Sequence, residues 1–294
     1  MDRVTREPAW TTDFERLGHM PDEDIDLAVA ALFIAQAEYP DLEGESELEA
    51  LDGMAAVVRQ RIEDDGDEGA LHRMNIISTW LADDLRFAGN HDNYYDARNS
   101  YINDVLDRHS GIPISLALIY IEVGRRAGMP LVGIGMPGHF LVGHSGIDDH
   151  YIDPFHGGTL ISREEAKALF DRMMANAPVS GPSQGRGKGQ GQSEIKWDDA
   201  YLTPVTNRDF VTRMLRNLKG IHLRFQDFDR AVRIIDMLVA MHPTSPEERR
   251  DRGLVHFKLG NRAQALSDLK VFAESQAPGL GDSTISNIIH RLGS

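Results

Sequence analysis

Two side chains that could handle a proton together stand close in the sequence, His139 in MPGHF and Asp153 in YIDPF. The short apolar runs around them are typical of adjacent antiparallel strands, so we expect the two side chains to meet. A carboxylate hydrogen-bonded to an imidazole fixes the tautomer of the ring and raises its basicity. His and Asp have this role in a catalytic triad, whose third member is the nucleophile. Such a pair is also common as a purely structural contact, and it does not show which residue would be the nucleophile.

The glycines just before His139 follow the spacing G-x-G-x-x-G in GIGMPG, residues 133–138. A dinucleotide-binding loop needs a helix directly after the glycines, because the helix N-terminus holds the phosphates. The next residues, HFLVGH, are typical of a strand, and the motifs that accompany a kinase-type loop are absent. We therefore interpret MPGHF as a tight turn that presents His139, and we predict no cofactor.

Imidazoles and carboxylates are dense in this part of the chain, which raises the alternative of a metal site. The residues concerned are His139, His144, His150, His156, Asp148, Asp149 and Asp153. In a regular strand His139 and His144 point to opposite faces, because they are an odd number of residues apart. The sequence therefore favours the absence of a metal site.

Composition excludes several classes of function. The chain of 294 residues has 46 acidic and 31 basic residues, a formal net charge of -15 and no cysteine. Disulfides, thiolate metal sites and a cysteine nucleophile are excluded, and the net charge disfavours nucleic-acid and anionic membrane partners. With no apolar run long enough to span a membrane, we expect a cytoplasmic protein.

Hydrophobic spacing predicts the elements that must position His139 and Asp153. Amphipathic helices are expected at 24–39, 46–63 and 69–87, a loop at 88–100, a buried helix at 113–127, strands within 131–136, 139–144 and 149–155, and a helix that begins at the capping box of Ser162 and Glu165 and runs to about 177.

The C-terminal part contains a repeat, preceded by a segment that has no apolar residue beyond Val179. Residues 178–194, rich in Gly, Ser and Gln, are expected to be flexible. Beyond them, His222, Ala231, Ile235 and Leu238 superpose on His256, Ala265, Leu269 and Phe272 at an offset of 34, the period of the tetratricopeptide helix pair. We expect an α+β domain at 1–177, a linker at 178–196 and helical repeats at 197–294.

Four motifs, NSYINDVL, GIPISL, PGHFLV and IDPFHGG, resemble the bacterial SirB family, a transglutaminase-like domain followed by tetratricopeptide-type repeats. The resemblance runs from about Leu85 through the repeats. It implies a papain-like α+β core, in which a helix carries a cysteine nucleophile and adjacent strands carry the His and Asp. His139 and Asp153 match those positions, whereas the cysteine position falls on Pro113.

Two functions follow from the resemblance. Without the cysteine, the chain is expected to be a non-catalytic module that binds a protein or peptide through the degenerate cleft or the helical repeats. The alternative is a hydrolase or acyltransferase that uses Ser115, two residues into the same helix, with His139 and Asp153. On an apolar helix face, however, a small serine is more often a packing residue.

Overall fold

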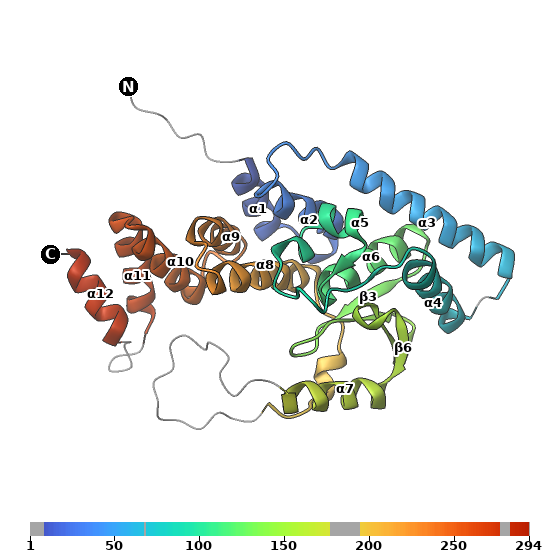
Figure 1. Ribbon diagram of the computed structural model, residues 1–294. Helices are drawn as coiled ribbons and strands as arrows, with labels where there is room; N and C mark the ends of the chain where they lie inside the picture. Colours follow the sequence, from blue (N-terminus) through green and yellow to red (C-terminus); the bar gives the residue numbers. More distant parts are fainter. Residues whose placement is uncertain (1–8, 68, 177–194, 277–282, 294) are drawn as a thin grey trace. The chain divides into compact units, whose positions relative to one another are not determined.

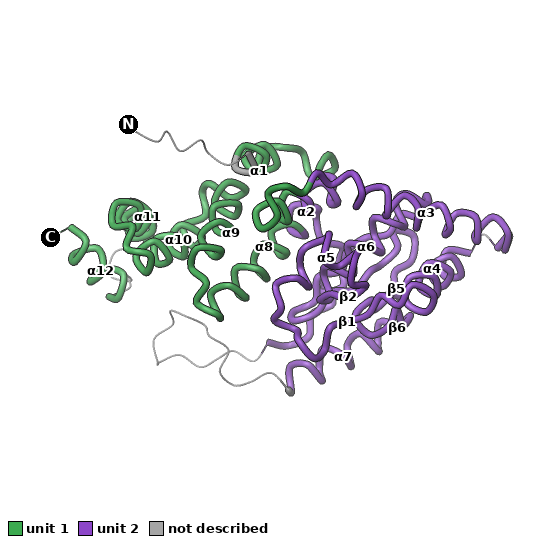
Figure 2. The backbone as a smooth tube through the Cα atoms, turned by 45° about the horizontal axis from the view of Figure 1, so that its top comes forward, with its two compact units in different colours: residues 1–25, 33–42, 211–294 green, residues 26–32, 43–210 purple. Residues whose placement is uncertain are grey.

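The computed structural model describes residues 9–67, 69–176, 195–276 and 283–293. They group into two compact units, drawn in Figure 2. Unit 2 contains residues 26–32 and 43–210, and unit 1 contains residues 1–25, 33–42 and 211–294. These units follow other boundaries than the domains expected at 1–177, 178–196 and 197–294. The segment expected to be flexible, 178–194, lies outside the described residues.

Unit 2 contains most of the helices expected from hydrophobic spacing. Its α-helices are α3 (Glu45–Asp65), α4 (Ala70–Ser78), α5 (Ile102–Arg108), α6 (Pro113–Arg126) and α7 (Arg163–Asn176), and α2 (Leu27–Gln36) begins in it. A π-helix, η2 (Thr79–Asp84), continues α4, and short 3-10 helices lie at η3 (Ala97–Asn99), η4 (Pro154–His156) and η5 (Asp199–Leu202). Within the described residues, no helix is long and apolar enough to cross a membrane.

A four-stranded antiparallel sheet forms the β part of unit 2, in the order β3-β4-β5-β6. Its strands are β3 (Leu131–Ile134), β4 (Leu141–His144), β5 (Ile147–Asp153) and β6 (Thr159–Ser162). The predicted strands are confirmed, and β6 is an addition. A second sheet is a parallel pair of two-residue strands, β1 (Ala88–Gly89) and β2 (Ser110–Gly111). Strand β1 lies inside the loop predicted at 88–100, and β2 follows that loop in sequence.

Helices cover both faces of this sheet (Figure 1). Helix α6 packs against β3 and β4, and a Cβ added at Gly124 would lie 2.5 Å from a methyl group of Leu131, so the helix and strand approach closely. On the other face, Ile134 and Leu141 share a core with Ala166 of α7. Because α6 is buried from Pro113 to Gly124, the position of its first turn is fixed by the surrounding core.

The rest of the helices belong to unit 1. They are α1 (Ala9–His19), α8 (Asn207–Arg224), whose first turn lies in unit 2, α9 (Phe228–Met241), α10 (Pro246–Leu259), α11 (Arg262–Ser275) and α12 (Ser283–Gly293), with the 3-10 helix η1 (Asp22–Asp24). The small residues of the predicted repeat, Ala231 and Ala265, are both 0% exposed. Such residues let neighbouring helices approach closely.

Helix α1 packs against α9, although more than two thirds of the chain separates them in sequence. A Cβ added at Gly18 would lie 2.7 Å from the carbonyl oxygen of Ala240, which shows how close the two backbones are. Phe14 is fully buried. The apolar face of α1 therefore completes the core of unit 1.

Candidate functional site

His139 is held by the turn that follows β3. Its backbone N–H donates to the carbonyl oxygen of Met136 at 3.2 Å, with Pro137 and Gly138 at the central positions. Gly138 has a φ of +77°, the left-handed conformation that glycine adopts without strain. No helix begins at His139, as predicted. The glycine motif thus builds a turn, and its form is that of a strand connection rather than a phosphate-binding loop.

Asp153 ends β5 and begins the 3-10 helix η4. Its Oδ1 accepts hydrogen bonds from the backbone N–H groups of Phe155 at 3.2 Å and His156 at 3.3 Å. Pro154 has no N–H to satisfy and suits the first helical position. Backbone N–H groups therefore orient the carboxylate of Asp153, independently of its contacts with side chains.

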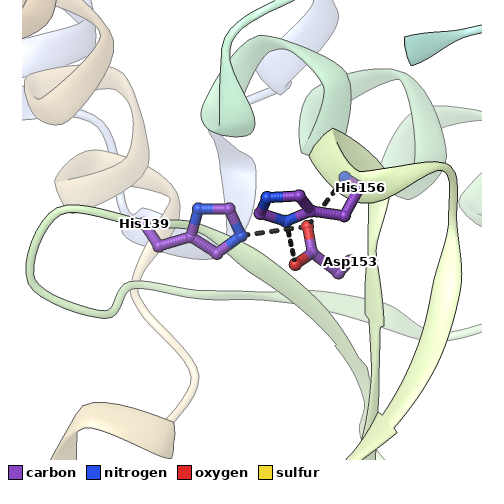
Figure 3. A group of neighbouring side chains, drawn as sticks. All are labelled: His139, Asp153 and His156. Carbon is purple, nitrogen blue, oxygen red and sulfur yellow. Dashed lines mark hydrogen bonds and ion pairs between the residues drawn. The ribbon is translucent and has the colours of Figure 1, made fainter. Parts of the chain in front are cut away.

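The predicted proximity of His139 and Asp153 is confirmed. The Nε2 atom of His139 lies 2.9 Å from Oδ1 of Asp153 (Figure 3). Both side chains are only 3% exposed. The imidazole and the carboxylate thus form a buried hydrogen-bonded pair, as expected from adjacent strands.

A third residue, His156, joins this pair. Its Nδ1 atom lies 2.7 Å from Oδ2 of Asp153, so the two histidines contact different oxygens of one carboxylate (Figure 3). The His156 side chain is 46% exposed, unlike its two partners. The sequence pointed to His156 only as one of the four histidines of the metal alternative. The motif Asp-Pro-Phe-His at residues 153–156 could have indicated this contact, because the side chain of an Asp at the start of a 3-10 turn faces the residue three positions later.

The other histidines of this segment are placed elsewhere. His144, at the end of β4, accepts the backbone N–H of Gly146 on Nδ1 at 3.0 Å. Neither His144 nor His150 belongs to the group of His139, Asp153 and His156 whose donor atoms lie within 4.8 Å of one another. Strand alternation thus separated His144 from His139, but it gave no information about His156, which follows the strand.

Electrostatics stabilise the ionised form of Asp153. Burial acts to raise its pKa, but hydrogen bonds from His139 and His156 outweigh burial and hold the pKa well below its usual range. The hydrogen bond to Asp153 in turn raises the pKa of His156, against the opposing effect of burial. The site is therefore a carboxylate between two imidazoles.

Aromatic rings lie beside this group. The ring of Phe155 lies 4.5 Å from that of His91 and 5.9 Å from that of Tyr94. The rings of His139 and His156 are 5.4 Å apart. Tyr94 is 36% exposed, so the polar group adjoins an aromatic surface.

Ser115, the candidate nucleophile, is bonded to the backbone. Its Oγ accepts the N–H of Ile112 at 3.0 Å and donates to the carbonyl oxygen of Asn99 at 2.5 Å, and Ser115 is 1% exposed. A serine hydroxyl has one proton, and both acceptors in reach are backbone carbonyls, the second that of Ile112 at 3.1 Å. The hydroxyl thus caps the first turn of α6. A catalytic role for Ser115, His139 and Asp153 stays a prediction.

Comparison with known proteins agrees with this architecture. Residues 45–216 match the transglutaminase-like superfamily and residues 218–292 match a tetratricopeptide repeat family. A UPF0162 protein of Xylella fastidiosa strain Temecula1 is 37% identical over 271 residues, which cover 91% of this chain and 88% of the relative.

Two further relatives match parts of the chain. Human F-box only protein 21 is 37% identical over 204 residues, 65% of this chain and 28% of that protein. Protein SirB1 of Salmonella typhimurium is 26% identical over 177 residues, 59% of each chain. No solved structure matches. The chain therefore belongs to the transglutaminase-like superfamily, as a SirB-like protein with C-terminal tetratricopeptide repeats.

Proposed function

We propose that this chain is a non-catalytic protein- or peptide-binding protein. The observation that carries the proposal is the hydrogen bonding of Ser115. Its hydroxyl is buried and capped onto the backbone of Asn99 and Ile112, and the position expected for a cysteine holds Pro113 at the first residue of α6. A nucleophile must direct its proton to a base, and this hydroxyl directs it to a backbone carbonyl.

The helical repeats are the proposed binding surface. Stacked helix pairs present extended surfaces that suit peptides and protein segments. At the end of α8, Phe225 is 64% exposed, and Val271 in α11 is 41% exposed. An exposed aromatic side chain such as that of Phe225 contributes strongly when an interface buries it.

Two further features belong to the same proposal. The partner is a protein rather than a nucleic acid, since the net charge of -15 repels phosphates. A cytoplasmic location fits a chain in which no cysteine could form a disulfide.

The second candidate is a hydrolase or acyltransferase that uses Ser115, His139 and Asp153. It is favoured by the buried pair itself, because His139 and Asp153 have the hydrogen bond that a general base needs, at 2.9 Å. It requires the Ser115 hydroxyl to leave the Asn99 carbonyl and turn to the imidazole.

Selection of peptides from a displayed library on the full-length protein tests the proposal. The affinity of a selected peptide is measured by fluorescence anisotropy, and its mass is followed during incubation. Phe225→Ser should weaken binding at least about tenfold, equivalent to about 1.4 kcal/mol. The matched control is Ile195→Ser, which changes a side chain that is 53% exposed in unit 2.

Each outcome decides between the candidates. Binding without turnover, unchanged in Ser115→Ala and Ile195→Ser, supports the proposal. Loss of binding in Ile195→Ser but not in Phe225→Ser would move the surface to the transglutaminase-like unit. Turnover of the peptide, or labelling of Ser115 by a fluorophosphonate that disappears in His139→Ala, would establish the hydrolase instead.

A further inference from the structure

We propose that His139, Asp153 and His156 bind one transition-metal ion, with Zn²⁺ as the best match. Each of the three residues offers one donor atom, a ring nitrogen or a carboxylate oxygen, and these atoms all lie within 4.8 Å of one another (Figure 3). This proposal concerns unit 2 and is independent of peptide binding by the repeats.

The directions of the two rings support a common ligand. Both ring nitrogens point at the same carboxylate, His139 at 2.9 Å and His156 at 2.7 Å. In neutral rings, a metal ion takes the place of the proton on each of these nitrogens. The hydrogen bonds thus already direct two lone-pair positions toward one small volume beside Asp153.

The distances require a local rearrangement of the side chains. Zn–N bonds are about 2.0–2.1 Å, so two nitrogens on one tetrahedral ion are about 3.4 Å apart. The donor atoms here fall within 4.8 Å. His156 can supply the adjustment, because its side chain is 46% exposed and lies on a 3-10 turn of three residues.

The backbone prepares the carboxylate as a ligand. Two N–H groups, of Phe155 and His156, already donate to Oδ1 of Asp153. Oδ2, whose contact is with the His156 ring, is then the oxygen that can turn to an ion. Supporting hydrogen bonds of this kind orient ligating carboxylates in metal sites.

The donor set selects the class of metal. Two imidazoles and one carboxylate suit Zn²⁺ and related ions, whereas Mg²⁺ and Ca²⁺ prefer sites made of oxygen. Three protein ligands, one of them half-exposed, leave the fourth tetrahedral position for water. The same residues can therefore hold an ion without any thiolate, which this chain lacks.

Zinc titration of the chelator-treated full-length protein tests the proposal. Competition with a chromophoric chelator gives the affinity and stoichiometry, and Co²⁺ gives the absorption spectrum of the coordinated ion. We expect one ion per chain, with His156→Ala weakening zinc binding at least about a hundredfold, beyond the effect of losing a supporting contact. Zinc should also raise the melting temperature of the wild type, but not that of His156→Ala.

The matched control is His150→Ala, which removes another partly exposed imidazole from the same strand region. It should leave zinc affinity unchanged. Asp153→Asn, which keeps the shape of the side chain but removes its charge, should also weaken binding. If Asp153→Asn fails to fold, the comparison of His156→Ala with the wild type still decides the outcome, because the His156 side chain is 46% exposed and its removal disturbs the core little. Absence of stoichiometric binding, or equal affinities in His156→Ala and wild type, would overturn the proposal.

Discussion

The first turn of α6 and the end of β5 lie in the same unit, and they use their polar groups in opposite ways. At α6, Ser115 turns its hydroxyl to the backbone, behind a proline that has no N–H to offer. At β5, Asp153 binds two histidines, and one of them, His156, reaches the surface. One site has become part of the scaffold, whereas the other retains groups that a ligand can contact.

The largest expected effect tests the β5 side of this comparison. Asp153→Ala should lower the free energy of unfolding by about 3 kcal/mol, because a buried imidazole and two backbone N–H groups lose their acceptor. Urea denaturation of the full-length protein, followed on the transition of unit 2, measures the change. Asp149→Ala is the control.

Asp149 lies on the same strand but is 67% exposed in its ion pair with Arg163. Its removal should cost no more than about 0.5 kcal/mol. Equal losses for Asp149→Ala and Asp153→Ala would show that the buried carboxylate does not organise the site.

A pair of adjacent glycines gives the next effect. Gly157 and Gly158 have φ values of +70° and +67°, so alanine at either position costs about 1 kcal/mol in the backbone. A Cβ on Gly158 would also collide with Ser78 and lie 2.7 Å from the Tyr120 hydroxyl, whereas nothing lies within 4 Å of one on Gly157. We expect Gly158→Ala to cost about 2 to 3 kcal/mol in total, measured by calorimetry. Equal losses of stability in Gly157→Ala and Gly158→Ala would contradict the close packing of Gly158 against Ser78 and Tyr120.

The α6 side is tested by two buried serines. Ser115→Ala should cost about 1 to 2 kcal/mol, because the Ile112 N–H loses its acceptor and the Asn99 carbonyl loses a donor. Ser100 is 2% exposed and its hydroxyl has no hydrogen-bond partner. Ser100→Ala should therefore be neutral within about 0.5 kcal/mol. Urea denaturation measures both, and the reverse order would mean that Ser115 does not cap α6.

The smallest effect concerns pH and the support of α6. The hydrogen bond from Arg98 lowers the pKa of Asp96, which starts the 3-10 helix that carries Asn99, against the opposing effect of burial. Because the pKa is lower in the folded state, the stabilisation is present above the ordinary value of 3.8 and is lost as the pH falls through the folded value.

Asp96→Asn should thus destabilise by about 0.5 kcal/mol at neutral pH, a small value because the Arg98 side chain is 59% exposed. The difference from wild type should vanish in acid. Unfolding at a series of pH values checks this, with Asp92→Asn as the exposed control. A difference that grows as the pH falls would contradict the assignment.

Much of the fold could be predicted, because local patterns determine it. The capping box of Ser162 and Glu165 is present, with both reciprocal hydrogen bonds, at 2.7 and 3.2 Å. Helix α6 ends at Arg126, two residues before Gly128, which agrees with the predicted end of this helix at residue 127. The π-helix at Thr79–Asp84 could not be predicted, because one extra residue per turn leaves no clear mark on a short hydrophobic pattern.

The candidate site was predictable only where strands positioned it. His139 and Asp153 meet because adjacent antiparallel strands bring them together. The role of His156 depends on the 3-10 helix η4, which lies in the connection between the antiparallel strands β5 and β6. Periodicity arguments apply to extended strands, so they could not place this side chain. The hydrogen bonds of Ser115 were likewise hidden, since the carbonyl of Asn99 comes from a different segment.

The packing of α1 against α9 has a consequence for synthesis of the chain. Phe14 and Leu17, buried in unit 1, emerge from the ribosome roughly 200 residues before α9, which at about 5 to 20 residues per second means about 10 to 40 s. During that interval synthesis of the residues of unit 2 can be completed, while the apolar residues of α1 that α9 covers in the folded protein stay exposed to water. A nascent chain of this protein is therefore expected to expose a chaperone-binding segment at its first helix until translation of α9 is complete.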